Sequence, residues 1–298
     1  MSKPSCFVAT IDLSLADRLK SDLIEQGFRL SHPEHTLFLA QKEGIICTLY
    51  ASGKLTVQGK NKEEFITFYL EPEILKKLDY SYPHLHINFA RHIGVDEAGK
   101  GDYFGPLCIA AVEAEGETIQ KLLDLGVKDS KRMSENSIIK IAEELRAHFA
   151  HSVVAIFPSK YNTLYTKFRN LNRLLAWAHA TAIQNLAQKT GCTEALIDQF
   201  TDKNLVGEAL ASKQLQVHLT QRPRAEDDPV VAAASILARY SFVKGLEKLG
   251  EEISFTLPKG ASSAVIAAGK EVVKRHGKEI LAQIAKLHFK TTDMVLDQ

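Results

Sequence analysis

The chain has 298 residues, of which 45% are hydrophobic and 24% charged, proportions that are typical of a folded protein and exclude intrinsic disorder as its main state. The 37 basic and 36 acidic residues leave a net charge of +1, so no overall basic field indicates a nucleic-acid partner. The longest apolar stretch, over 230–238, is far shorter than the roughly 20 residues that span a bilayer, which predicts a protein without membrane segments.

The four cysteines lie far apart and form no Cys-x-x-Cys pair, which excludes a disulfide framework and the common zinc sites. The first residues have neither the apolar core nor the cleavage site of a signal peptide. Together these features predict a cytoplasmic protein.

The first part of the chain predicts a small α+β unit. Apolar residues at helical spacing predict a helix over 13–26, which ends at Gly27. Three short strands follow, over 35–41, 44–51 and 54–58. Pro83 breaks the pattern, and we place a domain boundary near residue 85, which gives domains 1–85 and 86–298.

The second part alternates strands with long helices and predicts an α/β domain. The predicted strands cover 92–96, 107–112, 153–157, 195–198 and 216–220. The predicted helices cover 134–149 and 172–188 and a third that begins near Pro229, with more helix toward the C-terminus.

The most informative segment is 94–106, in which a strand stops at two adjacent acids, Asp96 and Glu97, and enters a glycine-rich loop. A P-loop is excluded, because Gly101 stands where a Ser or Thr should hold magnesium and the acids would repel phosphate. Carboxylates at a strand end are suited instead to a hard divalent cation.

Partners for the two acids must come from elsewhere in the fold. Asp198 closes an apolar run, and Glu226 precedes the helix at Pro229. Taken singly, each acid is equally well explained as a solvated turn, a strand-end cap or a helix N-terminal charge. Four converging carboxylates, in contrast, could hold two metal ions that hydrolyse a phosphodiester.

Several separated segments together resemble the ribonuclease HIII family of type 2 ribonucleases H. The segments are 95–107, an Asp-Ser-Lys loop within 126–131, the helix at 170–179, 197–200, and 224–240, so the resemblance covers roughly residues 90–245. It implies a ribonuclease H-like mixed sheet flanked by helices. It also implies hydrolysis of the RNA strand of RNA–DNA hybrids, with water as the nucleophile and 5′-phosphate and 3′-hydroxyl products.

The resemblance implies that Asp96, Glu97, Asp198 and Glu226 are the catalytic residues and hold Mg²⁺ or Mn²⁺. The glutamate at 226 and the additional N-terminal domain favour type HIII over type HII. Arg224 replaces a more common lysine and keeps its charge. The neighbouring Asp227 and Asp228 stay open as substitute ligands.

The family match also gives the loop a role in substrate binding. Backbone groups at Gly99 and Gly101 can approach a ribose and read its 2′-hydroxyl, while Lys100 and Lys131 can meet adjacent phosphates. The basic residues over 270–290, Lys286 among them, are predicted to form a solvated helix face that could also touch phosphates.

Residues 50–59 resemble the hairpin of TATA-binding-protein-like domains, which implies a substrate-binding platform in residues 1–85. A local cluster of Lys54, Lys60 and Lys62 on one sheet face is the predicted contact with nucleic acid. We expect a monomer whose partner is the hybrid. Two alternatives stay open at this point: a metal-dependent DNA nuclease of the same fold, and a non-catalytic nucleic-acid binder.

Overall fold

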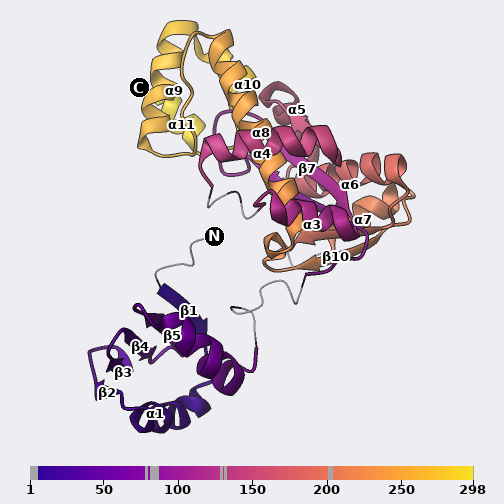
Figure 1. Cartoon of the computed structure of the whole chain (residues 1–298). Helices are drawn as coiled ribbons and strands as arrows, with labels where there is room; N and C mark the ends of the chain where they lie inside the picture. Colours follow the sequence, from indigo (N-terminus) through magenta and orange to yellow (C-terminus); the bar gives the residue numbers. More distant parts are fainter. Residues whose placement is uncertain are drawn as a thin grey trace. The chain divides into compact units, whose positions relative to one another are not determined.

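The computed structural model describes residues 6–77, 80, 87–127, 130, 133–200 and 204–297. The chain divides into two compact units, Met1–Ile87 and Asn88–Gln298, and the boundary expected near residue 85 lies close to this division. Figure 1 shows the first unit in indigo and purple and the second from magenta to yellow.

The N-terminal unit is an antiparallel sheet in the order β1-β5-β4-β3-β2. Its strands are β1 (Cys6–Thr10), β2 (Arg29–Ser31), β3 (Thr36–Lys42), β4 (Ile45–Tyr50) and β5 (Lys54–Gln58). Its helices are a 3₁₀ turn (Leu13–Leu15), α1 (Ala16–Glu25), α2 (Lys62–Phe65) and a π-helical continuation, η2 (Ile66–Leu75). The three predicted strands and the helix are present, whereas β1 and β2 were not predicted.

The described helices of the N-terminal unit cover one face of its sheet. Apolar residues of α1 and η2, such as Leu23 and Leu70, pack with Leu55 and Val57 of β5 in one core. Because strand residues alternate between faces, the residues between these core positions point away from the helices. On this open face Val8 keeps 54% and Ile46 36% of their surface exposed.

The second unit is built on a mixed five-stranded sheet in the order β10-β9-β6-β7-β8. Its strands are β6 (His92–Ala98), β7 (Leu107–Ala114), β8 (Ala150–Ile156), β9 (Glu194–Asp198) and β10 (His218–Arg222). Strands β6, β9 and β10 are parallel, and β7 runs antiparallel to both of its neighbours. This is the mixed α/β fold that the sequence predicts.

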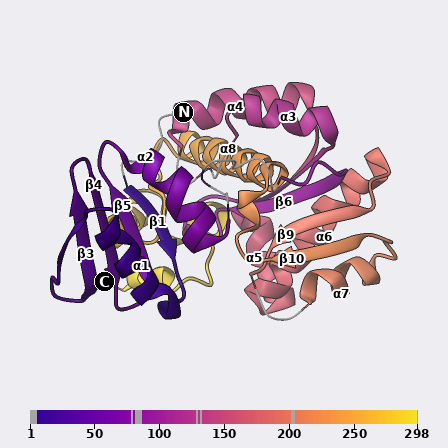
Figure 2. The ribbon, with the colours of Figure 1, turned by 60° about the horizontal axis from the view of Figure 1, so that its bottom comes forward.

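Helices flank this sheet on both faces (Figure 2). The helices of this unit are α3 (Gly116–Asp124), α4 (Glu135–His148), α5 (Pro158–Phe168), α6 (Leu171–Thr190), α7 (Leu205–Ser212), α8 (Pro229–Glu252), α9 (Ser263–His276), α10 (Leu281–Ile284) and α11 (Thr291–Leu296). Helices α3, α5 and α7 are not among the predicted elements. Among the described residues, none of the helices combines the length and the apolar character that crossing a membrane requires.

Two long helices approach the central strand from opposite sides. Val95 packs in the core that also contains the buried side of α6. On the other face lies Gly94, where a Cβ atom would come within 2.4 Å of the backbone of Val230 on α8. Glycine at this position therefore allows α8 to rest directly on β6.

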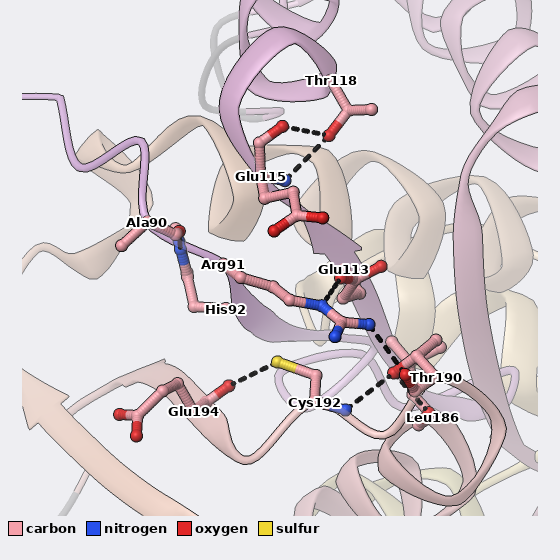
Figure 3. Close-up of polar contacts among 10 residues, drawn as sticks. All are labelled: Ala90, Arg91, His92, Glu113, Glu115, Thr118, Leu186, Thr190, Cys192 and Glu194. Atoms are coloured by element: carbon pink, nitrogen blue, oxygen red, sulfur yellow. Dashed lines mark hydrogen bonds and ion pairs between the residues drawn. The ribbon is translucent and has the colours of Figure 1, made fainter.

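At the end of the sheet away from the acids, Arg91 links three segments of the chain through hydrogen bonds (Figure 3). Arg91 Nε donates to Glu113 Oε1 at 2.6 Å, and its Nη2 donates to the carbonyl of Thr190 at 2.7 Å. This contact ties the start of β6 to the end of β7 and to the last turn of α6.

Candidate active site

Two of the predicted acids meet at the carboxyl ends of adjacent parallel strands. Val95 of β6 pairs with Ile197 of β9, so Asp96 and Asp198 follow at the same level, on strands that are about 4.8 Å apart. Both residues line one cavity of about 560 Å³, together with Glu97 and the loop that follows it. The structure thus brings together three of the four predicted carboxylates.

The fourth acid adjoins this cavity without lining it. Glu226 lies in the 3₁₀ turn Ala225–Asp227, directly after β10. The N–H of Ala225 donates to Asp198 Oδ1 at 3.2 Å, which ties the backbone beside Glu226 to the end of β9. Within the ranges that the structure describes, no three carboxylate, imidazole or thiol groups lie close enough to ligate one ion.

The substitute ligand Asp228 is already engaged. Its carboxylate caps α8 by accepting from the N–H of Val230 at 2.9 Å, and His92 Nε2 lies 3.1 Å from the same oxygen. The residue is buried, with 5% of its surface exposed, whereas Asp227 is exposed. Asp228 therefore caps α8 through Oδ1, and the alternative that Asp227 or Asp228 acts as a substitute ligand stays a prediction.

Asp96 and Glu97 point to opposite faces of β6, because neighbouring strand residues alternate. Asp96 lies on the side of α8, where Ser235 lines the same cavity, and its Oδ1 accepts from the N–H of Glu97 at 2.8 Å. Burial and, second, the charge of Glu97 raise the pKa of Asp96 to about 7. A bound cation would stabilise the ionised form of a carboxyl group that is buried beside other acids. The all-oxygen donor set fits Mg²⁺ or Mn²⁺.

Glu97 lies on the side of α6, where two cationic or hydrogen-bonding groups hold it. His179 Nε2 is 3.2 Å from Glu97 Oε2, and Lys100 Nζ is 3.6 Å from Oε1. Burial raises the pKa of Glu97, but the hydrogen bond and charge of His179, together with Lys100, outweigh burial and lower it. Glu97 is thus held as an ionised carboxylate.

His179 is not among the site residues that the sequence predicts. Its side chain is 1% exposed, and its ring lies 5.4 Å from that of Phe200. The available signal is a histidine within the alanine-rich, buried stretch of α6. Nothing in the sequence placed that position beside Glu97.

The two loop glycines differ in their surroundings. Gly99 has φ +85°, and a Cβ atom there would lie 2.2 Å from the carbonyl oxygen of Pro106. Only glycine fits such a position. At Gly101, in contrast, a Cβ atom would meet nothing within 4 Å. Gly101 therefore borders open space, where a ligand can approach the backbone.

A buried lysine holds the other end of this loop. Lys286 Nζ donates to the carbonyls of Asp102 and Gly105, both at 2.7 Å, and it is 0% exposed. Burial lowers its pKa to about 8. The prediction of a solvated basic face is therefore wrong for Lys286, although Lys270, Lys274, Arg275, Lys278 and Lys290 are exposed. Helical spacing could not reveal the difference, because Lys286 follows α10 rather than lying on it.

The lysines predicted to contact nucleic acid, apart from Lys100, fall into two groups. Lys131 lies outside the described residues, whereas its neighbour Ser130 lines the cavity and its Oγ is 2.5 Å from that of Ser235. Lys54 is exposed on β5, but Lys60 and Lys62 lie beyond the other end of that strand. The three N-terminal lysines therefore do not share one strand face, because the chain leaves the sheet after Gln58.

Comparisons with known proteins match this architecture. Residues 93–292 match the family described as Ribonuclease HII, and residues 6–80 match a domain of unknown function, DUF3378. A "Ribonuclease HIII" of Protochlamydia amoebophila is 52% identical over 99% of this chain and 98% of its own length. A "Ribonuclease HIII" of Chlamydia pneumoniae is 48% identical over 98% of both.

Solved structures agree with the sequence relatives. The structure titled "Crystal structure of Bst-RNase HIII in complex with Mn2+" is 28% identical, has a TM-score of 0.69 and covers 98% of both chains. The Aquifex aeolicus RNase H3 is 29% identical, with a TM-score of 0.57 over 95% of this chain and 100% of that one. With both units matched and identity near one half over the full length, the chain belongs to the ribonuclease HIII family.

Proposed function

We propose that Asp96, Glu97, Asp198 and Glu226 form the catalytic centre at which this ribonuclease H hydrolyses the RNA strand of RNA–DNA hybrids. Membership in the family establishes the endonuclease activity and sets aside the DNA nuclease and the non-catalytic binder. The observation that carries the assignment of the site is the register of β6 and β9, which sets Asp96 and Asp198 side by side above one cavity.

The four carboxylates would hold the divalent cations, Mg²⁺ or Mn²⁺, that we propose as cofactors. When bound, such ions activate water and neutralise charge on the cleaved phosphodiester. Neighbouring residues of the chain orient these carboxylates. His179 and Lys100 orient the two oxygens of Glu97, and Ala225 orients Asp198 through its N–H. Hydrolysis would leave 5′-phosphate and 3′-hydroxyl ends.

Recognition of ribose is assigned to the glycine loop. The open space beside Gly101 allows a sugar to reach backbone N–H and C=O groups, which can distinguish a 2′-hydroxyl from hydrogen. Lys100 is partly exposed beside the acids and can pair with a phosphate once the duplex displaces it from Glu97. Lys131 keeps its predicted phosphate contact as a proposal.

The N-terminal unit is proposed to bind the hybrid through the open face of its sheet. Within the described part of the N-terminal unit no helix covers that face, and the face displays the exposed Val8, Ile46 and Lys54. Its likeness to TATA-binding-protein-like domains and its role as a platform stay predictions. So do a monomeric state and a cytoplasmic location, although the free, largely buried cysteines accord with a reducing compartment.

The decisive experiment replaces Asp198 by Asn. The change keeps the size of the side chain and its hydrogen bond from Ala225 but removes a negative charge. We expect loss of hybrid cleavage with affinity for the hybrid retained, measured by cleavage assay and by fluorescence anisotropy in EDTA. Glu194→Gln, at the opposite end of β9, is the matched control and should cleave normally. Normal turnover by Asp198→Asn would refute the assignment.

A further inference from the structure

A second cavity in the catalytic unit has the composition of an anion site. It measures about 390 Å³ and lies between the end of α4, the middle of α8 and the start of the edge strand β8. All its polar side chains can donate hydrogen bonds, and none is a carboxylate. They are Arg146, His151, Ser152, Tyr240, Ser241 and Lys244.

Arg146 is already oriented in this cavity. Its Nη1 donates to Tyr240 Oη at 3.4 Å, and its Cζ lies 5.5 Å from the centroid of the Tyr240 ring. A guanidinium has five N–H donors, so several remain for a ligand. Because Tyr240 accepts from Arg146, its own hydroxyl hydrogen is free to donate to the same ligand.

The other two basic groups are partly committed. Lys244 Nζ donates to Glu247 Oε2 at 2.8 Å, and Glu143 also lies close enough to act on the pKa of Lys244. His151 Nδ1 is 2.9 Å from the carbonyl of Phe149, which fixes the ring. Arg146 is therefore the group on which an anion in this cavity would chiefly depend.

The cavity stands beside the acidic one on the same two helices. On α8, Arg239 lines the acidic cavity and the next residue, Tyr240, lines the basic one. On α4, Ile138 lines the acidic cavity and Arg146 lines the basic one. At 1.5 Å per residue these two positions are about 12 Å apart along the helix. Along the axis of a duplex each strand carries a phosphate about every 3.4 Å, so an axial span of this length contains a few phosphates.

We propose that this cavity binds a phosphodiester of the duplex backbone a few nucleotides from the cleaved bond. The inference rests on the proposed function, since it takes the acidic cavity as the cleavage site. A phosphate held here fixes the register of the duplex without reading its sequence. The same chemistry would accept free inorganic phosphate, so the experiment has to separate the two sources.

The test compares Arg146→Gln with Lys140→Gln, which removes the same charge from an exposed position of α4 outside the cavity. Hybrid affinity is measured by anisotropy in EDTA across a series of salt concentrations. For Arg146→Gln we expect affinity to fall about 3- to 10-fold at low salt and the slope of log affinity against log salt to shrink by roughly 0.9, the value for one phosphate contact. Lys140→Gln should match the wild type.

Turnover at saturating hybrid should be unchanged in Arg146→Gln, because the residue lies outside the acidic cavity. Wild-type affinity and slope in Arg146→Gln, or an equal loss in Lys140→Gln, would overturn the proposal. It would also fall if Arg146 governed binding of inorganic phosphate but not of the hybrid. If the wild type bound the hybrid with this Arg146 dependence but did not cleave it, the proposed function would fail while the phosphate site stood.

Discussion

Gly99 and Gly101 lie two positions apart in one loop, yet alanine should destabilise the fold at Gly99 and impair substrate binding at Gly101. Gly99→Ala introduces a Cβ atom 2.2 Å from the carbonyl oxygen of Pro106 and 2.8 Å from a ring carbon of Phe242. The new residue would also keep φ near +85°, where side chains are strained. Gly101→Ala introduces a Cβ atom into open space.

The magnitudes follow from these surroundings. A left-handed backbone costs a non-glycine residue about 1–2 kcal/mol, and overpacking costs about 1–3 kcal/mol more. Gly99→Ala should therefore lower the free energy of unfolding by about 2–5 kcal/mol. Gly101→Ala should change it by less than about 1 kcal/mol, because alanine without strain restricts the unfolded chain. The effect of Gly101→Ala should appear as weaker hybrid binding and slower cleavage, since the methyl group occupies the space assigned to the ribose.

Urea denaturation measures the first quantity, and cleavage of a hybrid at several substrate concentrations measures the second. The two variants serve as controls for each other. Equal destabilisation by both would show that the difference in loop geometry is wrong. A stable Gly101→Ala enzyme with unchanged KM and kcat would refute the placement of the ribose beside that glycine.

Two further predictions concern the lysines at either end of the chain. Folding lowers the pKa of Lys286 from 10.5 to about 8, so between these values the unfolded chain holds a proton that the folded chain has lost, and stability rises with pH. Across this pH window the free energy of unfolding of the wild type, measured by urea titration, should rise by up to about 3 kcal/mol relative to that of Lys286→Met. If the two proteins showed parallel pH profiles, the burial of the ammonium would be contradicted. Lys54→Gln should weaken hybrid affinity several-fold without slowing turnover at saturation. The control Lys77→Gln, beyond η2, should leave both affinity and turnover unchanged. Equal affinities of the two variants would exclude the open sheet face as the platform.

The elements with strong apolar periodicity could be predicted from sequence, and those fixed by pairing could not. The helix at 172–188 and the strand at 107–112 appear close to their expected places as α6 and β7. Strands β1 and β2 are short and acquire their identity only by pairing with β5 and β3. The strand expected at 216–220 lies at His218–Arg222, a shift set by the pairing of Arg222 with Asp198.

The candidate site shows the same limit. The acids could be chosen because each closes a strand or precedes a helix, which is a local pattern. The residues that support them could not, because their roles arise from contacts between distant segments. His179 reaches Glu97 across 82 positions of the chain, and Lys286 reaches Gly105 across 181. Only the folded chain shows that Asp228 is a cap and that Lys286 is internal.

The contact of Lys286 with the loop at Asp102–Gly105 bears on when the enzyme becomes active during synthesis. All four acids have left the ribosome's active centre well before Lys286 is added, yet the loop beside them lacks its buried donor until then. An unfinished chain, or one clipped ahead of α10, would carry its complete acidic set next to an unsupported loop. We therefore expect such a chain to cleave the hybrid poorly, because the loop that contains Gly101 would lack the hydrogen bonds that Lys286 donates.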